Sequence, residues 1–105
     1  MDLRSDEERW AVWMVQAERF AARQNFADAV ARMKLLRDQL GVALSEAADP
    51  KQRKRIERHL ARAEEQLTSM ESRYDAWRSE IAIRRQRTIN HAAEEMATPL
   101  PVPAD

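Results

Sequence analysis

The sequence contains no cysteine and a single glycine in 105 residues. Without cysteine, the chain has neither a disulfide framework nor a thiolate metal site. Its charges cancel, with 18 basic and 18 acidic residues, so no global field draws it to nucleic acid or to a membrane surface. No apolar run approaches the ~20 residues that span a bilayer, and residues 1–9 lack the apolar core of a signal peptide. These absences predict a cytoplasmic protein without a membrane span.

What the sequence does contain is a long apolar seam in its second half. Its residues recur at alternating intervals of four and three, which places them on one face of a helix and excludes a strand. With 34% charged residues and one glycine, the composition is also typical of long helices. We therefore predict an all-α fold that is more than three-quarters helical and has no strand. The seam consists of Ile56, Leu60, Ala63, Leu67, Met70, Tyr74, Trp77 and Ile81.

The first half of the chain carries two more apolar stripes that are out of phase with each other. One begins at Trp10 and the other at Phe26. At ~100° per residue, the two stripes would lie on opposite sides of one continuous helix. A turn at Gln24 and Asn25 would fold the second stripe back onto the first. The phase break therefore predicts two separate helices.

Two segments resemble helix starts. Ser5 and Glu8 fit a capping box, in which each side chain bonds the backbone N–H of the other. Asp49, Pro50 and Gln52 offer an N-cap, a proline at the first helical position and a glutamine at the third. The predicted helices cover about residues 6–23, 26–46 and 50–96 of a single domain, residues 1–97.

These helices differ in length, and the difference shapes the predicted fold. At ~1.5 Å per residue, the first two are roughly 27–30 Å long and the third is nearly 70 Å. We predict an antiparallel three-helix bundle with an elongated third helix, whose second half extends past the hairpin and leaves Tyr74, Trp77 and Ile81 uncovered. The alternative is a coiled-coil hairpin of two long helices. The residues expected to be buried together are Ala17, Phe20, Ala29, Met33, Leu36, Leu60, Ala63 and Leu67, with Trp10 and Trp13 also in the core.

Residues 98–105 are rich in proline and cannot continue a helix. We expect a disordered tail there. The alternation Pro99-Leu-Pro-Val-Pro103 also suits a short polyproline ligand.

The first two predicted helices resemble a single tetratricopeptide-repeat hairpin. Two features depart from that repeat: Gln24 occupies a position at which the repeat prefers glycine, and the chain has no second copy of the repeat. A lone repeat does not make a solenoid. The matching large and small positions are Trp13, Ala17, Phe20, Ala29 and Met33.

A second resemblance is to the microtubule-interacting-and-trafficking (MIT) domain. The stretch Ala17-Glu-Arg-Phe-Ala-Ala-Arg-Gln-Asn-Phe-Ala-Asp-Ala29 is similar to its first two helices. His59-Leu-Ala-Arg-Ala-Glu64 followed by Leu67 is similar to its third-helix pattern. The resemblance covers about residues 10–70 and implies a module that binds a short peptide in a groove between helices. The long extension of the third helix is not part of that family's minimal domain.

Basic residues gather at the start of the third helix. Cations there oppose the helix dipole, which suggests an anion-binding role, and the alternative interpretation is a solvated charged face. No aromatic residues are interspersed among them, so nucleic-acid binding is not expected. The cluster comprises Lys51, Arg53, Lys54, Arg55 and Arg58.

No catalytic signature is present. The sequence has no phosphate-binding glycine loop and no ordered triad. His91 stands at ligand spacing from Glu94 and Glu95, but two ligands do not complete a metal site, and no cofactor is expected. We expect a non-enzymatic interaction module that binds a partner helix or peptide along the third helix through Tyr74, Trp77 and Ile81. The alternative is a structural subunit that self-associates through this helix.

Overall fold

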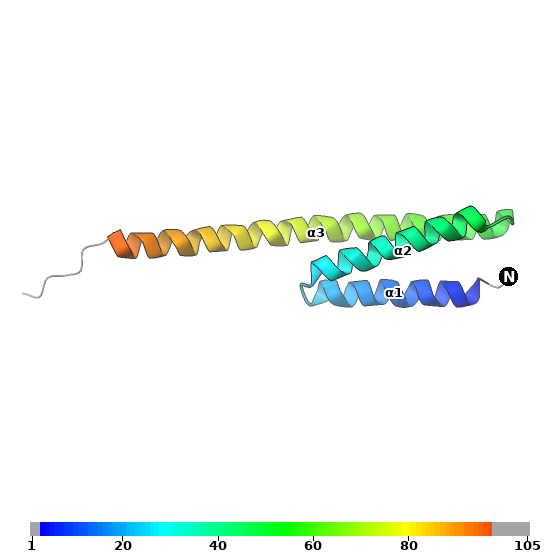
Figure 1. The fold of residues 1–105 in the computed structure, drawn as a ribbon, viewed down its shortest axis with the longest axis horizontal. Helices are drawn as coiled ribbons and strands as arrows, with labels where there is room; N and C mark the ends of the chain where they lie inside the picture. Colours follow the sequence, from blue (N-terminus) through cyan, green and yellow to red (C-terminus); the bar gives the residue numbers. More distant parts are fainter. Residues whose placement is uncertain (1–2, 98–105) are drawn as a thin grey trace, which may run out of the picture. The chain divides into compact units, whose positions relative to one another are not determined.

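A computed structural model describes residues 3–97, which form three α-helices and no strand (Figure 1). α1 spans Arg4–Ala22, α2 spans Phe26–Glu46 and α3 spans Pro50–Ala97. These helices have 19, 21 and 48 residues, so more than three-quarters of the chain is helical. The all-α class and the long third helix are confirmed. The predicted tail, residues 98–105, lies outside the described part of the chain.

The chain divides within α3 into two compact units. The first unit ends at Tyr74 and the second begins at Asp75. The first unit contains α1, α2 and the N-terminal part of α3, while the described helical part of the second unit is residues 75–97. The single domain expected for residues 1–97 stays a prediction.

A tight turn separates α1 from α2, so the alternative of two long helices is wrong. Gln24 adopts a left-handed conformation, with φ of 62°. Its N–H donates to the Ala21 carbonyl at 3.0 Å, and the Asn25 N–H donates to the Phe20 carbonyl at 2.8 Å. This pair of bonds is a Schellman motif, which normally carries glycine at the left-handed position. The turn therefore forms although the chain has glutamine there.

In the first unit, α3 runs antiparallel to α2 (Figure 1). At one end, Arg53 of α3 donates from Nη1 to the carbonyls of Leu44 and Ala47, at 3.0 and 2.9 Å. At the other end, the ring of Tyr74 lies 6.2 Å from the ring of Phe26, centroid to centroid. Residues near the end of α2 thus meet the start of α3, as a short connection between antiparallel helices requires.

The core of the first unit combines small and large apolar residues. Ala17, Ala29 and Ala63 are fully buried, which lets the three helices approach closely. No polar or charged residue is buried among residues 3–97. The buried residues are Trp10, Ala17, Ala21, Phe26, Ala29, Val30, Met33, Leu36, Leu40, Ile56, Ala63, Leu67 and Met70.

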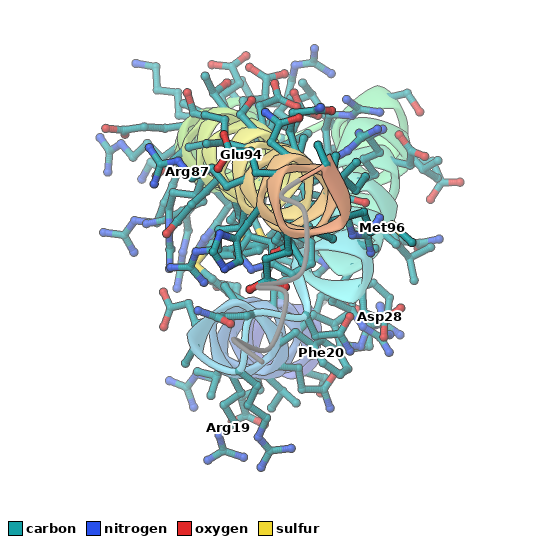
Figure 2. The ribbon with its side chains drawn as sticks, turned by 90° about the vertical axis from the view of Figure 1, so that its left-hand side faces the viewer. Arg19, Phe20, Asp28, Arg87, Glu94 and Met96 are labelled. Carbon is teal, nitrogen blue, oxygen red and sulfur yellow. The ribbon has the colours of Figure 1, made fainter. Side chains whose placement is uncertain are left out.

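Three residues expected in the core are only half-buried. Phe20 and Leu60 are two of them, intermediate between the buried core and the exposed surface. Phe20 lies near Asp28 of α2, while the adjacent Arg19 points away from the bundle (Figure 2). Trp13 is also half-buried, with the guanidinium carbon of Arg9 5.9 Å from its ring centroid.

One of the two predicted helix starts is wrong. α1 begins at Arg4, and the carbonyl of Leu3 accepts the Glu7 N–H at 2.8 Å. Ser5 therefore lies inside the first turn and does not cap the helix. The start of α3 is confirmed, because Oδ1 of Asp49 accepts the Lys51 N–H at 3.0 Å.

Candidate interaction surfaces

The second unit exposes large apolar side chains along its helix. Trp77 and Ile81 are half-buried, and Ile89 and Met96 are 61% and 90% exposed. Trp77, Ile81 and Ile89 belong to one ridge, because they are separated by multiples of four residues. Met96 points to the opposite side of the helix from Arg87 and Glu94 (Figure 2). The helix of this unit therefore presents partly or largely exposed apolar side chains among charged ones.

The predicted partner-binding residues fall into both units. Tyr74 ends the first unit, is half-buried and packs near Phe26. Trp77 and Ile81 belong to the second unit. The role of all three in binding a partner stays a prediction.

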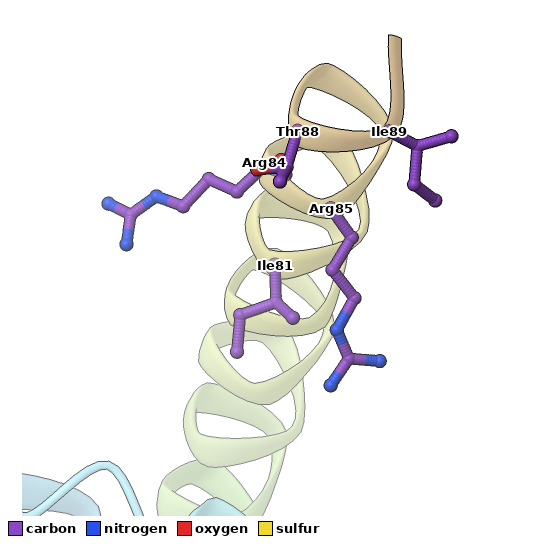
Figure 3. A pocket seen from close by; sticks show the side chains of 5 residues that line it. All are labelled: Ile81, Arg84, Arg85, Thr88 and Ile89. Atoms are coloured by element: carbon purple, nitrogen blue, oxygen red, sulfur yellow. Dashed lines mark hydrogen bonds between the residues drawn. The ribbon is translucent and has the colours of Figure 1, made fainter. Parts of the chain in front are cut away.

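A shallow depression on the second unit lies around Ile81 (Figure 3). Arg84 and Arg85 extend to either side of the helix, and Thr88 and Ile89 follow one turn later. The surface thus combines exposed apolar groups with two guanidinium groups. Sequence reasoning ended the seam at Ile81 and missed Ile89, whose signal was the interval of four residues continued through Arg85.

Among the described residues, some charged side chains on this helix form ion pairs and others do not. Arg84 forms an ion pair with Glu80, although both side chains remain more than half exposed. His91 lies 3.0 Å from Glu95. Arg85 and Arg87 make no ion pair with any residue in the described range 3–97. Two cations are therefore available to an external anion.

In the structure, some side chains of the predicted anion-binding cluster at the start of α3 contact other helices of the first unit, and the others are exposed. Arg53 is engaged with the carbonyls that end α2, and Arg55 forms an ion pair with Glu7 of α1. Lys51, Lys54 and Arg58 are exposed. Arg53 and Arg55 thus have structural contacts that explain cations near this helix start without a ligand.

Glu7 links α1 to α3, a contact that sequence reasoning missed. Its Oε2 lies 2.8 Å from Nε2 of His59, and its Oε1 lies 2.7 Å from Nη2 of Arg55 in an ion pair that falls short of hydrogen-bond geometry. The His59 ring packs 5.5 Å from the ring of Trp10. These contacts hold the starts of α1 and α3 side by side in parallel. Only the register between the two helices brings these residues together, so no local pattern reveals them.

A small cavity opens beside this contact in the first unit. Its apolar lining comes mainly from Trp10, Met14, Leu36 and Leu40. Arg62 lines both this cavity and a neighbouring depression that also includes Arg58 and Arg55. The cavity provides a concave surface next to basic side chains.

Residues 3–97 contain no group of three or more His, Cys, Asp or Glu that could hold a metal ion. None of the three described helices is both long and apolar enough to cross a bilayer. The expectation that the protein is not an enzyme stays a prediction.

No protein-family model, curated protein or solved structure matches the chain. The resemblances to the MIT domain and to a tetratricopeptide-repeat hairpin are therefore not supported by a family match. What the structure shows is a three-helix all-α fold.

Proposed function

We propose that the protein is an interaction module that binds another protein chain through the C-terminal part of α3. The observation that carries this proposal is the exposure of apolar side chains along residues 77–96. Ile89 and Met96 are more exposed than buried, and Trp77 and Ile81 are only half-buried. Exposed apolar patches on soluble proteins commonly mark interaction sites.

The energetic argument rests on Trp77 and Ile81. Tryptophan is enriched among the residues that dominate binding energy at interfaces. At about 25 cal/mol per Å² of apolar surface, complete burial of both side chains contributes several kcal/mol. That amount offsets a substantial part of the ordering cost of association.

The experiment compares the double variant Trp77→Ala/Ile81→Ala with the single variant Ile83→Ala. Ile83 is 53% exposed and follows Ile81 by two residues, which places it on the other side of the helix. Solution mass is measured by sedimentation equilibrium over a range of concentrations, and partner capture is measured with an immobilised chain. We expect the double variant to lose association or capture and Ile83→Ala to retain it.

Two outcomes of this experiment separate the alternatives. A wild-type mass that rises with concentration, and a double variant that stays monomeric, would favour the self-associating structural subunit. If the double variant keeps the wild-type mass and partners but loses several kcal/mol of stability, then Trp77 and Ile81 act within the monomer. That second result would contradict the proposed function.

A further inference from the structure

Charge is unevenly distributed along the interaction surface, because Glu80, Glu94 and Glu95 lie on either side of a stretch that has only basic charges. The net charge of the protein is zero. Residues 81–93, however, contain Arg84, Arg85 and Arg87 and no aspartate or glutamate. A local excess of positive charge therefore accompanies the exposed isoleucines of the second unit.

The arrangement of the side chains places cations against apolar groups. Ile81, Arg85 and Ile89 follow one another at intervals of four, so the guanidinium of Arg85 lies on the apolar ridge itself. Arg84 flanks Ile81 on the other side (Figure 3). Arg84 is 72% exposed despite its ion pair with Glu80, and Arg85 has no ion pair among the described residues. A partner that covers Ile81 must therefore also meet both arginines.

We propose that the partner of this surface is an acidic amphipathic α-helix of another protein. Its apolar side chains pack on Ile81 and Ile89, and its carboxylates accept hydrogen bonds from Arg84 and Arg85. Guanidinium groups match carboxylates in bidentate geometry. This inference rests on the proposed function and adds the chemistry of the partner.

A second copy of this chain fits the surface in few alignments. Pairing two such helices in parallel register brings Arg84 and Arg85 of one copy near the same residues of the other, and like charges in such positions oppose association. An antiparallel pair centred near Ile89 instead sets these arginines opposite Glu95 and Glu94 of the other copy. An acidic helix meets both arginines in many alignments, so charge complementarity favours a different, acidic chain, and a solution mass that rises with concentration in the absence of the probes would assign the surface to a second copy.

A lipid surface is a separate source of negative charge. Segments that recognise anionic lipids by charge typically carry clusters of about 4–8 Lys or Arg. The stretch of residues 81–93 has three arginines interleaved with apolar residues. This pattern fits recognition of a helix better, and binding to vesicles becomes an outcome of the test.

The experiment uses the full chain and two labelled synthetic helices about three heptads long. Both probes carry leucine at the core positions, and their flanking positions are all glutamate in one and all lysine in the other. Fluorescence anisotropy should show the glutamate probe binding at least ~10-fold tighter, a difference of about 1.4 kcal/mol. Added salt should reduce the difference.

Charge variants assign the effect to the proposed residues. Arg84→Gln/Arg85→Gln should abolish most of the preference for the glutamate probe. Arg87→Gln removes the same kind of charge from the other side of the helix and should retain the preference. Arg84→Glu/Arg85→Glu should reverse it. Circular dichroism checks that each variant stays helical.

The results that overturn this inference are distinguishable from failure of the proposed function. If both probes bind equally and Ile81→Ala weakens both, the interaction surface is supported but its preference for an acidic partner is contradicted. Binding of neither probe also overturns the inference. The proposed function is then decided separately, by whether Trp77→Ala/Ile81→Ala loses association or capture. Association with vesicles of phosphatidylserine and phosphatidylcholine through Arg84 and Arg85, without binding of the glutamate probe, would assign the surface to lipid.

Discussion

The carboxylate of Glu7 on α1 lies 2.8 Å from Nε2 of His59 on α3. These residues are 52 positions apart in the sequence. The same carboxylate forms an ion pair with Arg55, so one side chain of α1 holds two side chains of α3. Because Glu7 is only 18% exposed and Arg55 is 59% exposed, the contact is partly shielded from water on one side alone.

We expect Glu7→Gln to destabilise the first unit by about 1 kcal/mol, because it removes the charge that holds His59 and Arg55. Urea unfolding followed by circular dichroism measures the change. The control is Glu8→Gln, an exposed neighbour for which we expect little effect. Strong salt should reduce the difference between Glu7→Gln and wild type, since the Arg55 side of the contact is accessible to ions. Equal losses of unfolding free energy in Glu7→Gln and Glu8→Gln would contradict the role of Glu7.

Gln24→Gly should stabilise the protein by about 0.5–1 kcal/mol. The backbone of Gln24 is left-handed, a conformation that costs residues with a Cβ roughly 1–2 kcal/mol, and the greater flexibility of glycine in the unfolded chain offsets part of the gain. Thermal unfolding gives the measurement. Gln24→Ala retains a Cβ and should show no comparable gain, so a similar gain in both variants would rule out backbone strain as the cause.

Leu36→Ala should cost about 2–5 kcal/mol, because Leu36 is 1% exposed and its removal leaves a cavity in the bundle core. Its neighbour Leu35 is 42% exposed and provides a matched control with the same chemical change. Leu35→Ala should cost much less. Denaturant midpoints for the two variants make the comparison, and similar values would mean that the buried face of α2 is assigned incorrectly.

Arg53→Met should weaken the junction between α2 and α3 by about 1–2 kcal/mol. The substitution keeps much of the apolar stem but removes the donor that satisfies the carbonyls of Leu44 and Ala47. Lys54→Met changes the adjacent exposed cation and should have a smaller effect. Hydrogen exchange at the end of α2 should accelerate only in Arg53→Met. No local acceleration would show that water replaces the guanidinium at no cost.

The local patterns of the sequence determine the helices of this protein. The phase break between the stripes beginning at Trp10 and Phe26 predicted a turn that the left-handed Gln24 provides. Asp49 and Pro50 marked the start of α3 because capping depends on adjacent residues alone. The prediction from Ser5 was wrong for the same reason: a capping box is a local preference, and α1 begins at Arg4, two residues before the predicted start.

Contacts between helices were decided by the tertiary structure. The register of α1 against α3 brings Glu7 to His59 and Arg55, and no spacing along the chain encodes that register. Leu60 is likewise only half-buried, although it belongs to the same seam as the buried Ile56 and Ala63. Periodicity gives the direction in which a side chain points, while the depth of its burial depends on what the other helices place against it.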